Sequence, residues 1–184
     1  QTRLLWTRIL EFSLHIENNE GKTEHFEFLY NGNSDPRKEF ISELVKLIGN
    51  KGTILVYNQS FEIGRLKDLS EWFPEYKKVI EAMQKRIVDL YPVFRDFCYY
   101  NSKQQGSASI KDVLPAIAGK DYKGMEIDNG GKASAEFFNM TYGNCTEEQK
   151  NKTSENLLKY CEMDTLAEWL ILNKLKELVK LKIL

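Results

Sequence analysis

Residues 53–62 read TILVYNQSFE, and this stretch decides the fold. It opens with a short continuous apolar run, which is typical of a strand that is covered on both faces. Gly52 precedes the run, and a mostly helical pattern begins at Gln59. Ligands of open α/β sheets bind beyond the carboxyl ends of the strands. Glu62, in the first turn of the helix that leaves this edge, is therefore well placed for a metal or a substrate.

A purely structural interpretation of Glu62 stays open. A carboxylate in the first turn of a helix complements the helix dipole, which contributes about 0.3–1 kcal/mol. Spacing alone favours this structural interpretation over the functional one.

The residues before this stretch predict an antiparallel hairpin. In residues 9–16, ILEFSLHI, every second residue is apolar, which is the period of a half-buried strand. The apolar positions are Leu10, Phe12, Leu14 and Ile16. A polar stretch, 17–23, reads as a turn, and residues 25–30 alternate again through Phe26 and Phe28. The order of hairpin, helix, buried strand and further helices predicts a layered α/β domain.

Composition limits the possible classes of protein. The 184 residues are 42% hydrophobic, which suits one packed core, so we expect a single domain over residues 1–184. The net charge of -1 gives no global basic field, so any nucleic-acid binding must rest on a local patch. No apolar run approaches the ~20 residues of a membrane span, and no secretory signal opens the chain. We therefore expect no membrane partner and a cytoplasmic location.

The cysteines do not predict a metal site. Cys98, Cys145 and Cys161 are far apart, and only His15 and His25 could add nitrogen ligands. We therefore expect neither a structural zinc site nor a disulfide framework, but buried reduced thiols.

A second stretch with candidate functional residues, YCEMDT, occupies residues 160–165. Thr146 and Gln149 form a capping-box signature for the start of its helix. Tyr160 and Asp164 are four residues apart and share one face of that helix. An acid among apolar neighbours needs a partner or a metal, because burial of an unpaired charge is costly. Glu168 lies on nearly the same stripe, so the stripe could equally be the solvated edge of a groove.

Together the two stretches resemble motifs of the DEDD superfamily of 3′-to-5′ exonucleases. The segment from Asn58 to Glu62 resembles the second motif, Asn-x-x-Phe-Asp, and Tyr160-x-x-x-Asp164 resembles the tyrosine form of the third, as in the proofreading domains of DNA polymerases. Residues 86–90, RIVDL, and 106–115, GSASIKDVLP, resemble two further segments of these enzymes. The whole series is similar to an uncharacterised bacterial domain family related to them.

The resemblance implies a ribonuclease-H-like mixed sheet flanked by helices and a two-metal phosphodiesterase that uses Mg²⁺ or Mn²⁺. It implies that Glu62 and Asp164 hold metal and that Tyr160 orients the attacking water, which makes these three the catalytic residues. The substrate would be single-stranded DNA or RNA, or its 3′ end. Its contacts would come from Asn58, Phe61 and Lys111. Lys103, Lys120, Lys123 and Lys132 could extend a phosphate path, although ordinary surface lysines explain them as well.

Two departures temper these implications. Glu62 stands where the motif has Asp, and the first motif, Asp-x-Glu on the first strand, is missing. We therefore expect an N-terminally truncated fragment without its first strand, which binds metal poorly and catalyses little. The missing strand would leave a gap beside residues 53–57. We expect another chain, through self-association, or an upstream segment to fill the gap, in preference to residues 3–7 folding back. The alternatives are a non-catalytic module that binds nucleic acid or protein on the same fold, and a purely structural domain of a larger enzyme.

Overall fold

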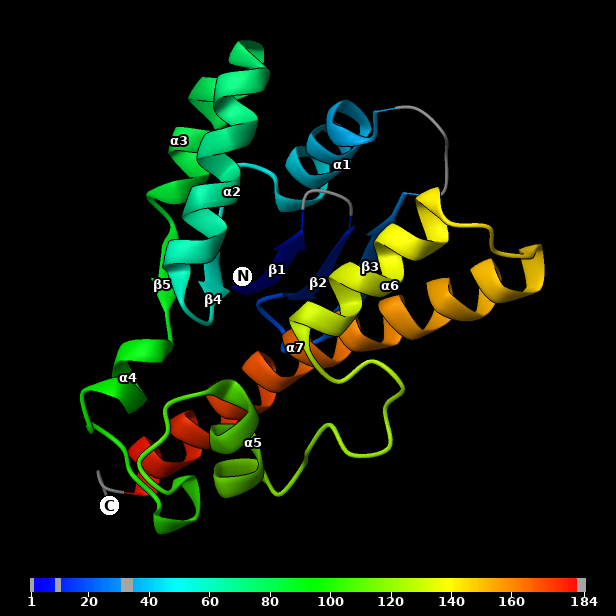
Figure 1. Ribbon diagram of the computed structural model, residues 1–184. Coiled ribbons are helices and arrows are strands. Elements are labelled where there is room, and N and C mark those ends of the chain that lie inside the picture. The colour runs from blue at the N-terminus through cyan, green and yellow to red at the C-terminus, as the bar shows by residue number, and fades with distance from the viewer. Residues whose placement is uncertain (1, 9–10, 31–34, 182–184) are drawn as a thin grey trace.

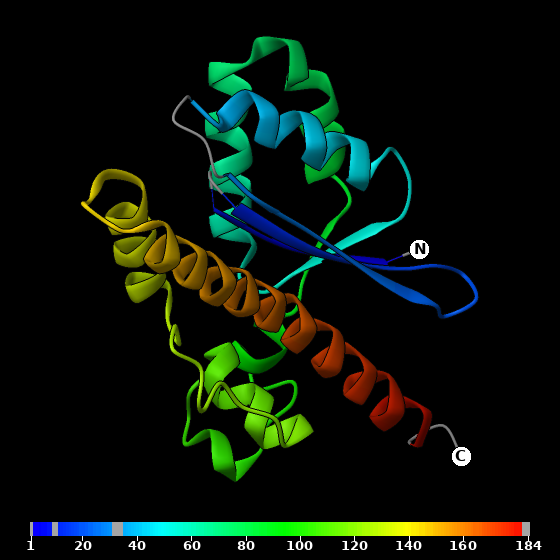
Figure 2. The same cartoon turned by 90° about the vertical axis from the view of Figure 1, so that its right-hand side faces the viewer.

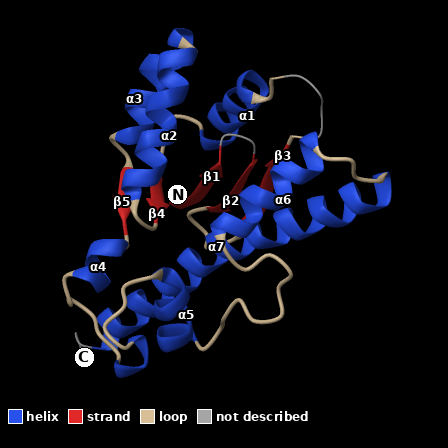
Figure 3. Ribbon diagram, viewed as in Figure 1, coloured by secondary structure: helices blue, strands red, loops and turns tan. Residues whose placement is uncertain are grey.

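A computed structural model describes residues 2–8, 11–30 and 35–181. The chain is a mixed α/β structure in which helices cover a five-stranded sheet (Figures 1 and 3). The sheet has the order β3-β2-β1-β4-β5. The strands are β1 (Thr2–Arg8), β2 (Glu11–Glu17), β3 (Thr23–Leu29), β4 (Thr53–Val56) and β5 (Ile87–Asp89). The predicted hairpin of β2 and β3 and the predicted strand β4 are confirmed, and Leu10 lies outside the described residues.

Strand β1 contradicts the expectation of a missing strand and an open gap. It pairs antiparallel with β2 from Thr2↔Glu17 to Arg8↔Glu11, and parallel with β4 from Thr2↔Thr53 to Leu4↔Leu55. The same chain therefore fills the place where we expected a second chain. A strand of its own satisfies the backbone groups of β2 and β4 without the loss of translational freedom that association costs.

Strand β2 was expected to be half-buried, and the structure shows it buried on both faces. Phe12 and Leu14 belong to a core cluster that includes Phe40 and Ile41. The opposite face of β2 presents Ser13, which is also fully buried. Helix α7 (Glu147–Leu181) covers that face, and α1 (Arg37–Ile48) covers the other (Figure 2). The alternation of side chains was thus predicted correctly, but the cover over the polar face was not.

Strand β4 is covered on both sides, as its apolar run predicts. Ile54 and Val56 lie in the core cluster on the α1 side, and Leu55 lies in the second cluster, which packs against α7. The remaining helices are α2 (Gln59–Trp72), α3 (Lys77–Gln84), α4 (Tyr91–Arg95), α5 (Ile110–Ala118) and α6 (Gly130–Tyr142). Helices α5 and α6 both pack on α7 (Figure 1). The sheet and α7 are therefore the common support of the molecule.

The start of α7 agrees with its predicted capping box. The Thr146 backbone N–H donates to Gln149 Oε1 at 2.8 Å, and the Gln149 N–H donates to Thr146 Oγ1 at 3.2 Å. Among the described residues, no helix combines the length and the apolarity needed to cross a membrane. The cysteines are free thiols, but only Cys161 is buried, and Cys98 is exposed, contrary to the expectation of three buried thiols.

Candidate carboxylate site

Four acidic side chains meet where β4 and β5 end. Glu62 lies in the first turn of α2, Asp89 ends β5, and Asp164 and Glu168 lie one turn apart on α7. We call them the carboxylate cluster. Burial raises the pKa of Glu62 to about 8, and the charges of Asp89 and Asp164 add to this rise. Burial also raises the pKa of Glu168 well above its ordinary value, with further contributions from Glu62 and Asp164. The fold thus brings Glu62 and Asp164 together.

Two oxygens of this cluster are buried without a hydrogen-bond partner. They are Oε2 of Glu62 and Oε2 of Glu168. Glu62 is 2% exposed and Glu168 is 1% exposed. The other oxygen of Glu168, Oε1, accepts a hydrogen bond from the Tyr57 N–H at 3.1 Å. The stripe on α7 is therefore not a solvated edge. Unpaired buried carboxylates are costly, so these two either keep their protons or hold a cation.

Asp89 has a different role from the other three acids. Its carboxylate accepts hydrogen bonds from the backbone N–H groups of Asn58 at 2.8 Å, Gln59 at 3.0 Å and Tyr91 at 2.9 Å. It therefore fixes the turn from β4 into α2. Asn58 occupies the left-handed region there, with φ of 71°, a conformation that Asn tolerates better than most residues. Asp89 thus positions the start of the helix that carries Glu62.

The predicted substrate-binding residues at this turn are accessible. Asn58 is exposed, and its side-chain oxygen accepts a hydrogen bond from Ser60 Oγ at 2.5 Å. The Phe61 ring is 44% exposed and lies 5.8 Å from the Arg65 guanidinium carbon. Both residues can reach a ligand that approaches the carboxyl edge of the sheet.

Tyr122 is a member of the site that the motifs do not indicate. Its hydroxyl donates to Asp164 Oδ1 at 2.7 Å, and both groups are buried. Burial raises the pKa of Tyr122, and the charge of Asp164 raises it further, so the hydroxyl keeps its proton. The ring lies 6.3 Å from the ring of Tyr160, which is itself 4% exposed. Tyr160 and Asp164 are therefore held on the same buried side of α7.

Lys111 lies over this pair of tyrosines. Its Nζ is 5.3 Å from the centroid of the Tyr122 ring and 5.6 Å from that of the Tyr160 ring, within the range of cation–π attraction. The same Nζ donates to the backbone oxygen of Asp128. The other candidate lysines are exposed, in agreement with ordinary surface lysines: Lys103, Lys120, Lys123 and Lys132.

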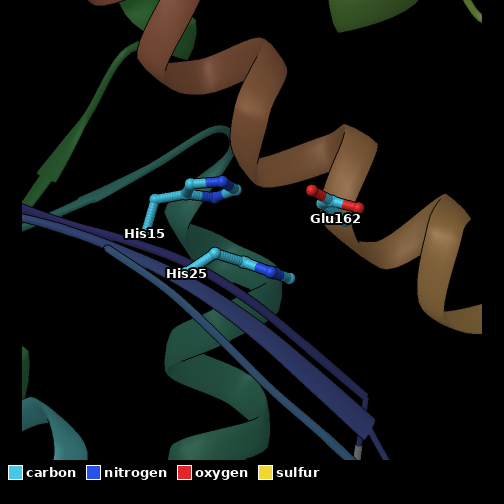
Figure 4. A group of neighbouring side chains, drawn as sticks. All are labelled: His15, His25 and Glu162. Atoms are coloured by element: carbon cyan, nitrogen blue, oxygen red, sulfur yellow. The ribbon is translucent and has the colours of Figure 1, made fainter. Parts of the chain in front are cut away.

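The described residues contain one group of three His, Cys, Asp or Glu side chains whose ligand atoms all lie within 4.8 Å of one another. It is not the carboxylate cluster but His15, His25 and Glu162, on the β2–β3 side of α7 (Figure 4). An ion at the carboxylate cluster would thus need water or phosphate oxygens to complete its shell, as Mg²⁺ usually does.

Residues 6–109 match the family described as Domain of unknown function (DUF2779). A curated relative, Uncharacterized protein MG366 of Mycoplasma genitalium (strain ATCC 33530 / DSM 19775 / NCTC 10195 / G37), is 29% identical over 156 residues. That alignment covers 78% of this chain and 23% of the Mycoplasma protein, so the chain spans less than a quarter of its relative. No solved structure matches. Because the family match covers more than half of the 184 residues, the chain belongs to the DUF2779 family.

Proposed function

We propose that the carboxylate cluster binds Mg²⁺ or Mn²⁺ and serves a nuclease of the DEDD type, which removes nucleotides from the 3′ end of single-stranded nucleic acid. The observation that carries this proposal is the pair of buried, unpartnered oxygens of Glu62 and Glu168 beside Asp164. Oxygen ligands of this kind suit hard divalent cations, and a cation would stabilise all three charges together.

The arrangement of strands supports the proposal. Strands β1, β2 and β3 form an antiparallel meander, and β4 and β5 lie parallel to β1 on its other side. This is the order expected of a ribonuclease-H-like sheet. The cluster lies at the carboxyl ends of β4 and β5, which is the edge where ligands of open α/β sheets bind.

The residues around the cluster have chemistry that suits a phosphodiester. A bound divalent ion would supply activation of water and stabilisation of the leaving 3′ oxygen. Glu62 and Glu168 would give up their protons on binding, because ligating carboxylates are ionised. Lys111 offers a positive charge beside Tyr160 for a phosphate, and the exposed Phe61 ring offers a surface for a base.

The acids present also set a limit on this chemistry. Strand β1, TRLLWTR, carries no carboxylate, so the Asp-x-Glu pair of the resemblance has no counterpart there. Glu168 supplies a buried acid in addition to Glu62 and Asp164. We therefore expect weak metal binding by these 184 residues, with catalysis dependent on further acids.

The first test measures Mn²⁺ binding by calorimetry in the chain and in Glu62→Gln and Glu168→Gln, with Glu71→Gln as control. Glu71 is on the same helix as Glu62, but its side chain is 63% exposed. We expect the two buried variants to bind at least about tenfold more weakly, because each loses a ligand charge. Equal affinities in all four proteins would contradict the proposal.

The second test measures hydrolysis by a form of the protein that also carries an Asp-x-Glu strand. A 3′-labelled single-stranded oligonucleotide should be degraded only with Mg²⁺ or Mn²⁺, and Asp164→Asn should abolish the activity, because a metal ligand stabilises charge in the transition state. Undiminished metal-dependent activity of Asp164→Asn would exclude Asp164 as a ligand.

A binding module without catalysis is the second candidate. It is favoured by the absence of an acid from β1 and by the hydrogen bond from Tyr122, which already satisfies one oxygen of Asp164. In this case the chain binds single-stranded nucleic acid, and Lys111→Ala weakens that binding. Neither added metal nor Asp164→Asn changes the affinity for nucleic acid. Binding that persists without hydrolysis in the form with the Asp-x-Glu strand would favour this candidate.

A further inference from the structure

We propose that His15, His25 and Glu162 form a second, separate site for a divalent transition-metal ion of the zinc class. The site joins the β2–β3 hairpin to α7. It does not depend on the nuclease proposal, since it shares no ligand with the carboxylate cluster.

The sheet register creates the imidazole pair. His15 of β2 and His25 of β3 are direct partners in the antiparallel ladder, so their side chains leave the same face of the sheet. Their rings stack with centroids 4.6 Å apart and an interplanar angle of 28°. Figure 4 shows both imidazoles extending toward α7, on which Glu162 lies. The ligand atoms of the three residues lie within 4.8 Å of one another.

These separations are close to those of an occupied site. Zinc bonds of about 2.0–2.1 Å place tetrahedral ligand atoms about 3.3 Å apart. The 4.8 Å limit therefore leaves a contraction of up to about 1.5 Å on binding. Glu162 is exposed, so its side chain can make its part of this movement, and small rotations of the two rings bring the imidazole nitrogens together.

The hydrogen bonds around the imidazoles leave one nitrogen of each ring available. Thr165 Oγ1 donates to the backbone oxygen of Glu162 at 3.2 Å, so it must accept from His15 Nδ1 at 2.8 Å and from Ser13 Oγ at 2.8 Å. Ser13 Oγ must then accept from His25 Nε2 at 2.9 Å. This is the one proton arrangement that satisfies all four hydrogen bonds. It leaves a lone pair on Nε2 of His15 and on Nδ1 of His25.

This arrangement is the outer shell that metal-binding histidines use. A ligating imidazole usually donates its other N–H to a neighbouring oxygen, which fixes its tautomer and orientation. Here Thr165 accepts the hydrogen bond from His15 and Ser13 accepts the one from His25, and both of these hydroxyl residues are fully buried. Two imidazoles and one carboxylate suit zinc and its neighbours in the transition series better than Mg²⁺. With three protein ligands, a fourth position stays open for water.

The test titrates Zn²⁺ by calorimetry and Co²⁺ by visible absorption into untagged protein. Its background is Glu62→Gln with Cys98→Ser and Cys145→Ser, which removes the accessible thiols and a ligand of the other cluster. His25→Gln and Glu162→Gln each remove one proposed ligand. Glu155→Gln is the matched control, because Glu155 is on α7 with a side chain that is 71% exposed. Apart from Glu62→Gln, each of these substitutions replaces a side chain that is at least partly exposed.

We expect one ion per chain in the background and in the control. His25→Gln should weaken Zn²⁺ binding at least about 100-fold, and Glu162→Gln at least about tenfold, since loss of a ligand exceeds the effect of an outer-shell change. The Co²⁺ spectrum should lose its ligand-field bands in both variants, and Zn²⁺ should raise the melting temperature only where the site is intact. Equal affinities in all variants, or no stoichiometric binding by the background protein or by the unsubstituted chain, would overturn the proposal.

Discussion

Polar side chains are buried in two different ways on the two sides of α7. We call the side that faces β4 and β5 the carboxylate side, and the side that faces β2 and β3 the imidazole side. On the β4–β5 side, Asp164 meets acids that leave two oxygens without partners. On the β2–β3 side, Glu162 meets imidazoles whose hydrogen bonds are all assigned except at one nitrogen of each ring. The first side suits a hard cation and the second a transition metal. One helix can thus present two chemically distinct sites, because side chains two positions apart leave opposite sides of a helix.

The largest expected effect comes from loosening α7, which supports both sides. Ile171 is fully buried on this helix, so Ile171→Ala should lower the free energy of unfolding by about 2–5 kcal/mol. Val179→Ala, at a position 57% exposed, should change it by less than about 0.5 kcal/mol. Urea unfolding measures both. A similar loss in the two variants would mean that α7 does not pack as described.

The carboxylate side should make the metal-free protein less stable at high pH. The raised pKa of Glu62, about 8, lies above its unfolded value, so the folded state binds the extra proton. This stability is present below the unfolded pKa of about 4.3 and is lost as the pH rises toward 8. The loss should be on the order of 2–3 kcal/mol, and Glu62→Gln should remove much of it. Urea unfolding from pH 5 to pH 8 tests this, and a pH profile shared by the two proteins would contradict it.

The imidazole side should have the opposite dependence on pH. Burial lowers the pKa of His15 to about 4, and the charge of His25 lowers it further. A histidine whose folded pKa is depressed contributes stability above its unfolded pKa, and this stability is lost as the pH falls from about 6.5 toward 4. We expect a loss of about 1–2 kcal/mol without metal. NMR titration of the His15 ring measures its pKa directly, and a value near 6.5 would remove this contrast between the two sides.

The sequence predicted the local structure of the carboxylate side better than the residues that surround it. Local patterns sufficed for β4, for α2 and for the position of Glu62 in the first turn of α2, because a buried strand and a first helical turn are predicted from adjacent residues. Tyr122 was missed because it lies between α5 and α6, where no periodicity marks its burial. The place of β1 was also missed, because strand pairing depends on partners far along the chain.

The imidazole side could not be predicted from the spacing of residues. His15 and His25 are ten positions apart, and only the register of the hairpin makes them direct partners. Glu162 reaches them because α7 crosses the polar face of β2, a contact between residues about 150 positions apart. The expectation of no structural zinc site rested on the cysteines, and the group found here contains none of them. The alternation of side chains in β2 predicts that Ser13 and His15 share one face, and this was the one feature of the sequence that pointed to the site.

The smallest expected effect decides whether Asp164 belongs to the metal site or only to the packing. Tyr122→Phe removes the hydroxyl that donates to Asp164 Oδ1 and should lower the free energy of unfolding by about 1 kcal/mol. If Asp164 is a metal ligand, loss of this outer-shell hydrogen bond should weaken Mn²⁺ binding by about tenfold, while Zn²⁺ binding at the imidazole side stays unchanged. Tyr142→Phe is the control, because Tyr142 is 73% exposed. Calorimetric titration with both ions measures the difference. Unchanged Mn²⁺ affinity with the same loss of stability would assign Asp164 to packing, because removal of the hydrogen-bond partner of a ligating carboxylate changes the affinity for its ion.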